Sequence, residues 1–264
     1  MSILGLGGEG ILRTHGRMDE AVPVIRRAID EGVTYFDTAP AYDGSRDYLG
    51  AALGPDRARI FLASKTHLRD GAGTRRLLDD SLKRLKTSHI DLLQLHDLRS
   101  MDELDEIFAS DGALPALLKA RDEKTIRFIG LTGHHDVRVL REALRRFAFD
   151  AVLTVVNAAE PHGSSFMRDV IPEARRQQMG VVGMKVLARQ RVFSMPGTET
   201  PQKALRYAWS QQIDVAIVGC GTPVEVSENA AAARAFIPLS PEENAALEAR
   251  GKSIQAAINP WKHG

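Results

Sequence analysis

Eight short apolar runs, each followed by a stretch with helical periodicity, constrain the fold of this chain more than any other feature. The runs are rich in β-branched residues and cover 2–6, 33–36, 59–64, 90–95, 127–131, 151–156, 181–184 and 214–218. Nearly continuous apolar runs are typical of strands that are buried on both faces, as they are in parallel sheets. The sequence therefore predicts eight parallel strands.

The segments between these runs have the pattern of amphipathic helices, with apolar and charged residues on opposite faces. One helix is expected to end at Gly32, because glycine favours the position just past a helix. A second is expected to begin after Asp136, a candidate N-cap, and a third at Thr200-Pro201. Strands and helices thus alternate along the whole chain.

Such alternation is compatible with an open doubly wound sheet or with a closed (β/α)₈ TIM barrel. Eight units favour the barrel, and 264 residues is an ordinary length for one barrel domain. No linker, low-complexity segment or shift in composition divides the chain. We therefore expect a single TIM-barrel domain over residues 1–264.

Composition argues against several classes of function. The chain has 35 basic and 34 acidic residues, so it lacks the excess positive charge expected of a nucleic-acid-binding domain. No apolar run approaches the length of a membrane span, and the first residues do not resemble a signal peptide. The single cysteine, Cys220, fits a reducing compartment and is expected to be a buried apolar residue. We expect a cytoplasmic protein without nucleic-acid or membrane partners.

Polar residues follow three consecutive predicted strands, at the end where TIM barrels carry their active sites. Asp37, Lys65 and His96 each come directly after an apolar run, and Tyr42 lies in the loop beyond Asp37. Taken singly, each has a common structural role, such as a turn, a side chain reaching solvent or a hydrogen-bonded core residue. Four such groups at one end of one barrel instead predict a catalytic site.

The four residue types suit the protonation of a carbonyl oxygen. A free tyrosine has a pKa of about 10, which makes its phenol a weak acid at neutral pH. A neighbouring ammonium lowers that pKa, and a carboxylate keeps the ammonium charged. An imidazole within reach can hydrogen-bond to the same carbonyl oxygen. This set of groups predicts general acid catalysis while hydride reaches the carbonyl carbon.

The segments that carry these residues resemble the aldo-keto reductases. Residues 36–44 (FDTAPAYDG) resemble the family's FDTAxxY signature, 63–66 (ASKT) its lysine strand and 91–96 (DLLQLH) its histidine strand. The resemblance extends over nearly the whole chain in the family's order. It implies an NAD(P)H-dependent oxidoreductase that reduces aldehydes and ketones by direct hydride transfer. It also implies that Tyr42 is the general acid, Lys65 modulates its pKa, Asp37 pairs with Lys65 and His96 orients the carbonyl.

The resemblance implies no metal, and the sequence shows no metal-ligand spacing. His134 and His135 are adjacent, unlike the helical pair of a typical zinc site. We therefore expect no metal.

The glycine-rich start of the chain literally matches GxGxxG, the dinucleotide-binding fingerprint of an open sheet. The residues that follow Gly10 have a loop pattern, however, and helical periodicity begins only near Met18. The barrel interpretation is favoured, with 5–10 as the flexible first loop and Gly8 close to the nicotinamide.

The resemblance also makes Asp37 a cofactor-binding residue, and further cofactor residues are expected at later strand ends. In the family, a serine and the asparagine after it bind the carboxamide of the nicotinamide, and Thr132 takes the place of that serine. Asn157 matches an asparagine after the sixth strand. Lys185 is placed to reach a phosphate, next to Met184, where many members stack an aromatic ring on the nicotinamide.

The last predicted loop resembles the family's pyrophosphate and adenosine loop. It contributes Gly219 and Gly221, and Asn229 matches a contact with adenine. The family favours NADP(H), but basic residues for a 2′-phosphate are missing here, and Glu225 would repel that phosphate. NAD(H) therefore remains an alternative.

Two other functions are compatible with a barrel of this kind. A non-catalytic module could bind the nicotinamide nucleotide and report redox state, but it would not need all four polar strand-end residues. A hydrolase or isomerase would need paired carboxylates or a metal, and Asp97 is the only extra candidate at these strand ends.

Trp261, the one large aromatic residue near the C-terminus, is expected to pack on the barrel wall. The sequence leaves the carbonyl substrate, the direction of reaction and the oligomeric state open.

Overall fold

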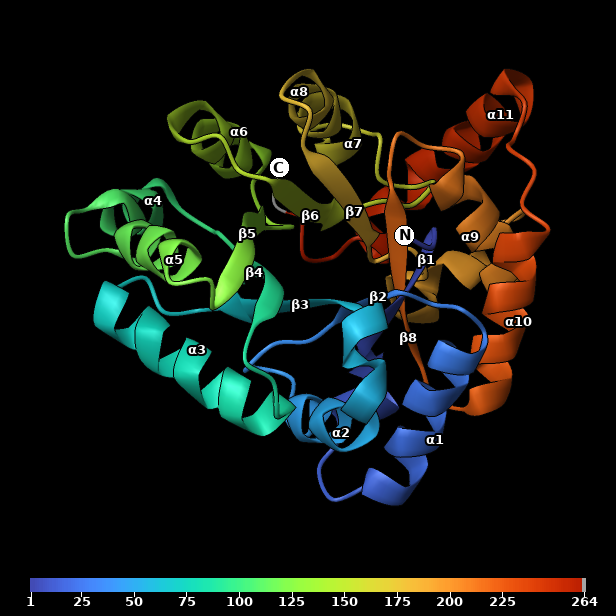
Figure 1. Cartoon of the computed structure of the whole chain (residues 1–264). Coiled ribbons are helices and arrows are strands. Elements are labelled where there is room, and N and C mark those ends of the chain that lie inside the picture. Colours follow the sequence, from blue (N-terminus) through green and yellow to red (C-terminus); the bar gives the residue numbers. More distant parts are fainter. Residues whose placement is uncertain (263–264) are drawn as a thin grey trace.

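Eight parallel strands close into a barrel in the computed structural model, which describes residues 1–262 (Figure 1). Each strand pairs with its neighbours in the sequence, and β1 pairs with β8 to complete the ring. The strands are β1 (Leu4–Gly10), β2 (Tyr35–Asp37), β3 (Phe61–Thr66), β4 (Ile90–Leu95), β5 (Ile126–Thr132), β6 (Ala151–Val155), β7 (Gly180–Met184) and β8 (Val215–Cys220). The predicted (β/α)₈ TIM barrel is confirmed.

Helices surround the barrel on its outside (Figure 1). The α-helices are α1 (Met18–Asp30), α2 (Ser45–Ala52), α3 (Gly71–Leu85), α4 (Met101–Phe108), α5 (Ala113–Asp122), α6 (Val137–Arg146), α7 (Phe166–Asp169), α8 (Ile171–Arg176), α9 (Pro201–Trp209), α10 (Pro223–Arg234), α11 (Pro241–Gly251) and α12 (Gln255–Ile258). Four 3₁₀ segments accompany them: η1 (Ile11–Arg13), η2 (Gly54–Arg59), η3 (Ala188–Ser194) and η4 (Lys252–Ile254).

The predicted helix boundaries agree with the observed caps. The Asp136 carboxylate accepts a hydrogen bond from the Arg138 backbone, and the Thr200 hydroxyl accepts one from the Lys203 backbone. Helix α1 begins at Met18, and Gly32 adopts a φ of +82° just beyond its end. These caps satisfy backbone donors at helix ends that would otherwise lack partners.

The glycine-rich start differs from the expected loop. Strand β1 continues to Gly10, with a shift of register against β8 between Leu6 and Gly10. Glycine disfavours strands, which is why the pattern predicted a loop. Close approach of two backbones explains the difference, since a Cβ at Gly7 would lie 3.2 Å from the Val218 carbonyl carbon. Only the short 3₁₀ segment η1 follows directly, α1 begins at Met18, and the sheet is closed, so the dinucleotide-fingerprint alternative is wrong.

Side chains inside the barrel and outside it form separate cores. The interior core contains Tyr35, Ala63, Leu92, Ala151, Leu153, Val182 and Val215, while a larger core lies between the strands and the helices. Side chains two residues apart along a strand point to the same face. Asp37 and Lys65, each two residues beyond an interior residue, therefore also point inward, at the C-terminal end of the barrel.

The last part of the described chain returns to the strand ends. Asn259 hydrogen-bonds to Asn157, and the Trp261 carbonyl oxygen lies 2.9 Å from Nδ1 of His135. The Trp261 ring lies beside His134 and Lys185, with Lys185 Nζ 4.9 Å from its centroid. Trp261 thus packs against the core between strands and helices and also among strand-end residues, where Asn259 anchors the segment at β6.

Two smaller expectations agree with the structure. Cys220 is buried, and its sulfur lies 3.6 Å from the amide nitrogen of Asn229. Burial raises the pKa of this thiol to about 12, which keeps it protonated at neutral pH. Within residues 1–262, no helix has the length and apolar character needed to cross a membrane.

Candidate active site

A buried ion pair joins the ends of β2 and β3. Lys65 Nζ lies 2.6 Å from Asp37 Oδ2 and 3.0 Å from the carbonyl oxygen of Thr38, and both side chains are almost fully shielded from solvent. Burial disfavours the ammonium, but Asp37 and Tyr42 outweigh it and raise the pKa of Lys65. Lys65 therefore carries a fixed positive charge at the end of the barrel.

Tyr42 lies directly beside this pair. Lys65 Nζ is 4.8 Å from the centre of the Tyr42 ring. Burial raises the pKa of the phenol above its ordinary value, and Lys65 opposes the rise. The expected net lowering by Lys65 does not occur, because desolvation is the larger effect. The phenol is therefore protonated at neutral pH and able to donate its proton.

His96, directly after β4, completes the group. Its ring meets the Tyr42 ring edge-on, with centroids 5.8 Å apart. Burial, together with the nearby Lys65 charge, lowers the pKa of His96 to about 3. The imidazole is thus neutral at physiological pH, where it can donate a hydrogen bond without adding a charge. The structure brings all four predicted catalytic residues together.

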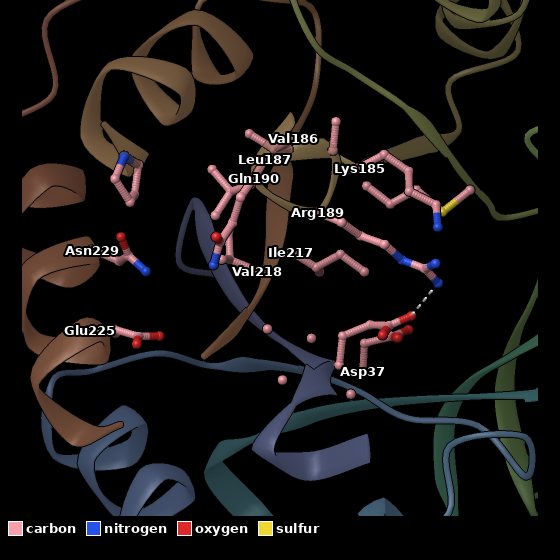
Figure 2. A pocket seen from close by; sticks show the side chains of 18 of the residues that line it. Asp37, Lys185, Val186, Leu187, Arg189, Gln190, Ile217, Val218, Glu225 and Asn229 are labelled. Atoms are coloured by element: carbon pink, nitrogen blue, oxygen red, sulfur yellow. Dashed lines mark ion pairs between the residues drawn. The ribbon is translucent and has the colours of Figure 1, made fainter. Parts of the chain in front are cut away.

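A groove of about 450 Å³ begins at Asp37 and Tyr42 and extends across the ends of β7 and β8. Figure 2 shows Asp37 at one side of the groove and Glu225 and Asn229 at the other, with Ile217 and Val218 between them. The loop after β7, which includes Lys185 and Gln190, forms another edge. This elongated shape suits a ligand that reaches from the four polar residues to the start of α10.

Two glycines that line the groove allow close packing within the protein. A Cβ at Gly8 would lie 2.5 Å from Cδ2 of Tyr42, and a Cβ at Gly219 would lie 2.6 Å from the Glu9 carbonyl carbon. Neither position tolerates a side chain without movement of its neighbours. The glycines therefore allow Tyr42 and the strand backbones to approach closely.

Comparison with known proteins identifies the family. The model of the aldo/keto reductase family matches residues 3–194, most of the chain. The chain belongs to the aldo/keto reductase family. It is therefore an enzyme, an oxidoreductase of carbonyl substrates, as the strand-end residues predicted. L-galactose dehydrogenase from Arabidopsis thaliana is 25% identical to this aldo/keto reductase, and the match covers 100% of this chain and 92% of the plant protein.

Solved structures of aldo-keto reductases have the same fold. One from Bacillus halodurans superposes with a TM-score of 0.79 at 23% identity, covering 95% of this chain and 92% of the other. One from Klebsiella pneumoniae, in complex with NADPH, superposes with a TM-score of 0.76 at 25% identity, covering 94% of this chain and 90% of the other.

The structure places most of the predicted cofactor residues of this aldo/keto reductase along the groove. Six line it: Gly8, Asp37, Lys185, Gly219, Glu225 and Asn229. Gly221 lies beside it, where its backbone nitrogen donates to Glu225 Oε2 at 2.8 Å. Glu225 is therefore held at the start of α10, where it adds negative charge to this end of the groove.

Thr132 and Asn157 are buried and do not line the groove. The Asn157 amide nitrogen donates to Asn259 Oδ1 at 2.8 Å, and its oxygen accepts from the Ala159 backbone at 3.1 Å. Asn157 thus holds the C-terminal segment against β6.

Several groups near the site were not predicted. Arg13 lies over the Tyr42 ring, 5.3 Å from its centre, and pairs with Glu9 at 2.7 Å. Arg189 also approaches Glu9, at 3.9 Å, and this pair crosses the groove as the dashed line of Figure 2. Glu9 lies near the end of β1, and Arg13 and Arg189 lie in the 3₁₀ segments η1 and η3. No periodic pattern in the sequence indicates their contacts. Asp97, His134 and His135 were noticed separately, but only the structure brings them together.

Proposed function

We propose that this enzyme interconverts a carbonyl compound and its alcohol, with a nicotinamide nucleotide in the groove and Tyr42 as the proton donor. The observation that carries the proposal is the buried Lys65–Asp37 pair beside Tyr42, at one end of an elongated groove. When bound, the nicotinamide supplies or accepts hydride at the substrate carbon.

Tyr42 gives its proton to the carbonyl oxygen in the direction of reduction. The raised pKa keeps the phenol protonated before the step, and the Lys65 ammonium stabilises the phenolate that remains after it. Asp37 holds Lys65 in place and balances its charge. In the reverse direction, the phenolate takes the proton from the alcohol.

His96 orients the substrate. As a neutral imidazole next to Tyr42, it donates a hydrogen bond to the same carbonyl oxygen and aligns that oxygen with the phenol. The general acid and the orienting donor thus approach the oxygen from the ends of β2 and β4, on either side of β3.

The groove fits an extended dinucleotide. Gly8 and Gly219 line the groove without side chains, so a ligand there meets backbone atoms. Lys185 lines the same groove and supplies positive charge for a phosphate, and Asn229 lies at the far end. The Klebsiella relative, solved with NADPH, supports the same class of cofactor for this chain.

The choice between NADPH and NADH depends on the far end of the groove. Glu225 and Glu228 line it there. Two carboxylates oppose a 2′-phosphate, while family membership favours NADP(H). Fluorescence titrations with NADPH and with NADH, each in separate samples, measure this preference directly.

The same titrations test the proposed function when a panel of carbonyl compounds follows. The panel contains simple aldehydes, ketones and aldoses, since the Arabidopsis relative is named for a sugar. We expect binding of at least one cofactor and its oxidation when a carbonyl is added. Binding of neither cofactor would contradict the proposal, and binding without turnover on any substrate would favour a non-catalytic sensor.

A further inference from the structure

Three side chains at the ends of β4 and β5 converge near the catalytic group. Asp97 follows His96, and His134 and His135 follow β5 by two and three residues. Asp97 Oδ1 lies 3.0 Å from His134 Nδ1 and 3.3 Å from His135 Nε2. In the described part of the chain, they form the one cluster of three or more His, Cys, Asp or Glu side chains with its ligand atoms within 4.8 Å of one another.

We propose that Asp97, His134 and His135 form a binding site for one divalent transition-metal ion of the zinc class. Ligands about 2.0 Å from a tetrahedral zinc lie about 3.3 Å from one another, close to the two measured separations. Two imidazoles and one carboxylate select zinc, cobalt or ferrous ions over calcium or magnesium, which prefer oxygen ligands.

The donor atoms are protected from bulk water. Asp97 Oδ1 and His134 Nδ1 are both shielded from solvent and lie 3.0 Å apart. Shielded donor atoms that converge at this separation suit ligands of a common ion.

Second contacts orient the carboxylate and one imidazole. His135 Nδ1 lies 2.9 Å from the Trp261 carbonyl oxygen, so it carries the proton and places the lone pair of the neutral ring on Nε2. Asp97 Oδ2 accepts from Arg99 at 2.6 Å, which directs Oδ1 towards the histidines. Metal-bound histidines and carboxylates usually have such outer partners.

The loops that carry the ligands are fixed against one another. The Leu98 backbone nitrogen donates to the Thr132 carbonyl oxygen at 2.8 Å, which attaches the loop after β4 to the end of β5. The three side chains remain between 16% and 18% exposed. An ion can therefore enter, and water can complete its coordination. Through His135 and Trp261, the ion would join these loops to the C-terminal segment.

The test is a titration of untagged, chelator-treated protein with Co²⁺, followed by displacement with Zn²⁺. Bound Co²⁺ absorbs visible light when its coordination is tetrahedral or five-coordinate. We expect one equivalent to bind and Zn²⁺ to displace it. Asp97→Asn and His134→Ala should each raise the dissociation constant about tenfold or more, whereas His15→Ala, which removes an exposed histidine on another loop, should leave it unchanged.

Two results would overturn the site: the absence of stoichiometric Co²⁺ binding, or equal binding by wild type and Asp97→Asn. Far-ultraviolet circular dichroism of each metal-free variant establishes that it is folded. X-ray absorption of the Zn²⁺-loaded wild type provides a check that needs no variant. It should show two imidazoles and one carboxylate oxygen at about 2.0 Å, and a shell with sulfur or with oxygen alone would contradict the assignment.

Discussion

Polar residues at the ends of β2 to β4 and at the ends of β5 and β6 were predicted by the same reasoning, yet they have different surroundings. Asp37, Lys65 and His96 converge on Tyr42. Asp37 and Tyr42 line the groove. Thr132 and Asn157 are equally buried but lie away from the groove. In the second region, the Asn157 amide nitrogen donates a hydrogen bond to Asn259, which is 102 residues away in sequence.

The difference teaches that a strand-end position brings a side chain to the active end of a barrel without deciding its role. In the first region, the partners come from neighbouring strands, whose positions the fold fixes. In the second, the partner comes from a segment whose docking the local pattern does not specify. Catalytic chemistry is therefore expected to depend on the β2–β4 end, and the anchoring of the C-terminal segment on the β6 end.

The largest effect is expected from Lys65→Met. This change removes the charge that stabilises the phenolate and leaves Asp37 buried without its partner. Turnover should fall at least about 10²-fold, and the free energy of unfolding should fall by about 3–5 kcal/mol. Steady-state kinetics and urea unfolding measure the two effects.

The double variant Asp37→Asn/Lys65→Met separates them. It should regain stability relative to Lys65→Met while remaining inactive, because the buried charge is gone but the cation is still missing. Recovery of activity in the double variant would contradict the role assigned to Lys65.

A smaller loss is expected from Gly8→Ala. The added Cβ would lie 2.5 Å from the Tyr42 ring and must displace it. A shift of about 1 Å in a catalytic group can reduce the rate about 10²-fold, so we expect a loss of about 10- to 100-fold in kcat. Gly180→Ala, at a position where an added Cβ makes only ordinary contacts at 3.7 Å with Ala151 and Asp150, is the control. Equal kcat values for wild type and Gly8→Ala would show that the close contact is unimportant.

At the far end of the groove, Glu225→Lys should change cofactor preference. Replacing the carboxylate with an ammonium favours binding of a 2′-phosphate. We therefore expect the affinity for NADPH relative to NADH to rise about tenfold, which corresponds to about 1.4 kcal/mol. Fluorescence titration of both cofactors measures this ratio. Glu106→Lys, an exposed residue of α4 away from the groove, should leave it unchanged. If the ratio of NADPH affinity to NADH affinity were the same in both variants, Glu225 would not lie near the adenosine part of the cofactor.

The smallest effect on activity is expected from Asn157→Ala. The change leaves the buried Asn259 amide without its partner, which should lower the free energy of unfolding by about 1–3 kcal/mol. Cofactor affinity and kcat should remain within about threefold of wild type. A large loss of cofactor affinity would instead show that Asn157 contacts the cofactor. It would then contradict the distinction between the β2–β4 end and the β5–β6 end.

Periodicity and strand-end positions were sufficient to predict the closed barrel and to bring Asp37, Tyr42, Lys65 and His96 together. The extension of β1 to Gly10 was missed because glycine content predicts a loop, whereas close packing on β8 favours a strand. The raised pKa of Tyr42 was missed because burial of a loop residue depends on the whole site. The position of Trp261 depends on how the C-terminal segment docks, which arises from contacts between residues far apart in sequence.

The most direct test of the account compares Tyr42→Phe with Tyr35→Phe. Both remove one phenol hydroxyl, but the Tyr35 hydroxyl lies inside the barrel and is buried without a hydrogen-bond partner among residues 1–262. Cofactor affinity and turnover are measured on the same preparations. The account predicts that Tyr42→Phe binds the cofactor normally and loses about 10²- to 10⁴-fold in turnover, while Tyr35→Phe keeps both. Normal turnover by Tyr42→Phe would contradict the assignment of Tyr42 as the proton donor.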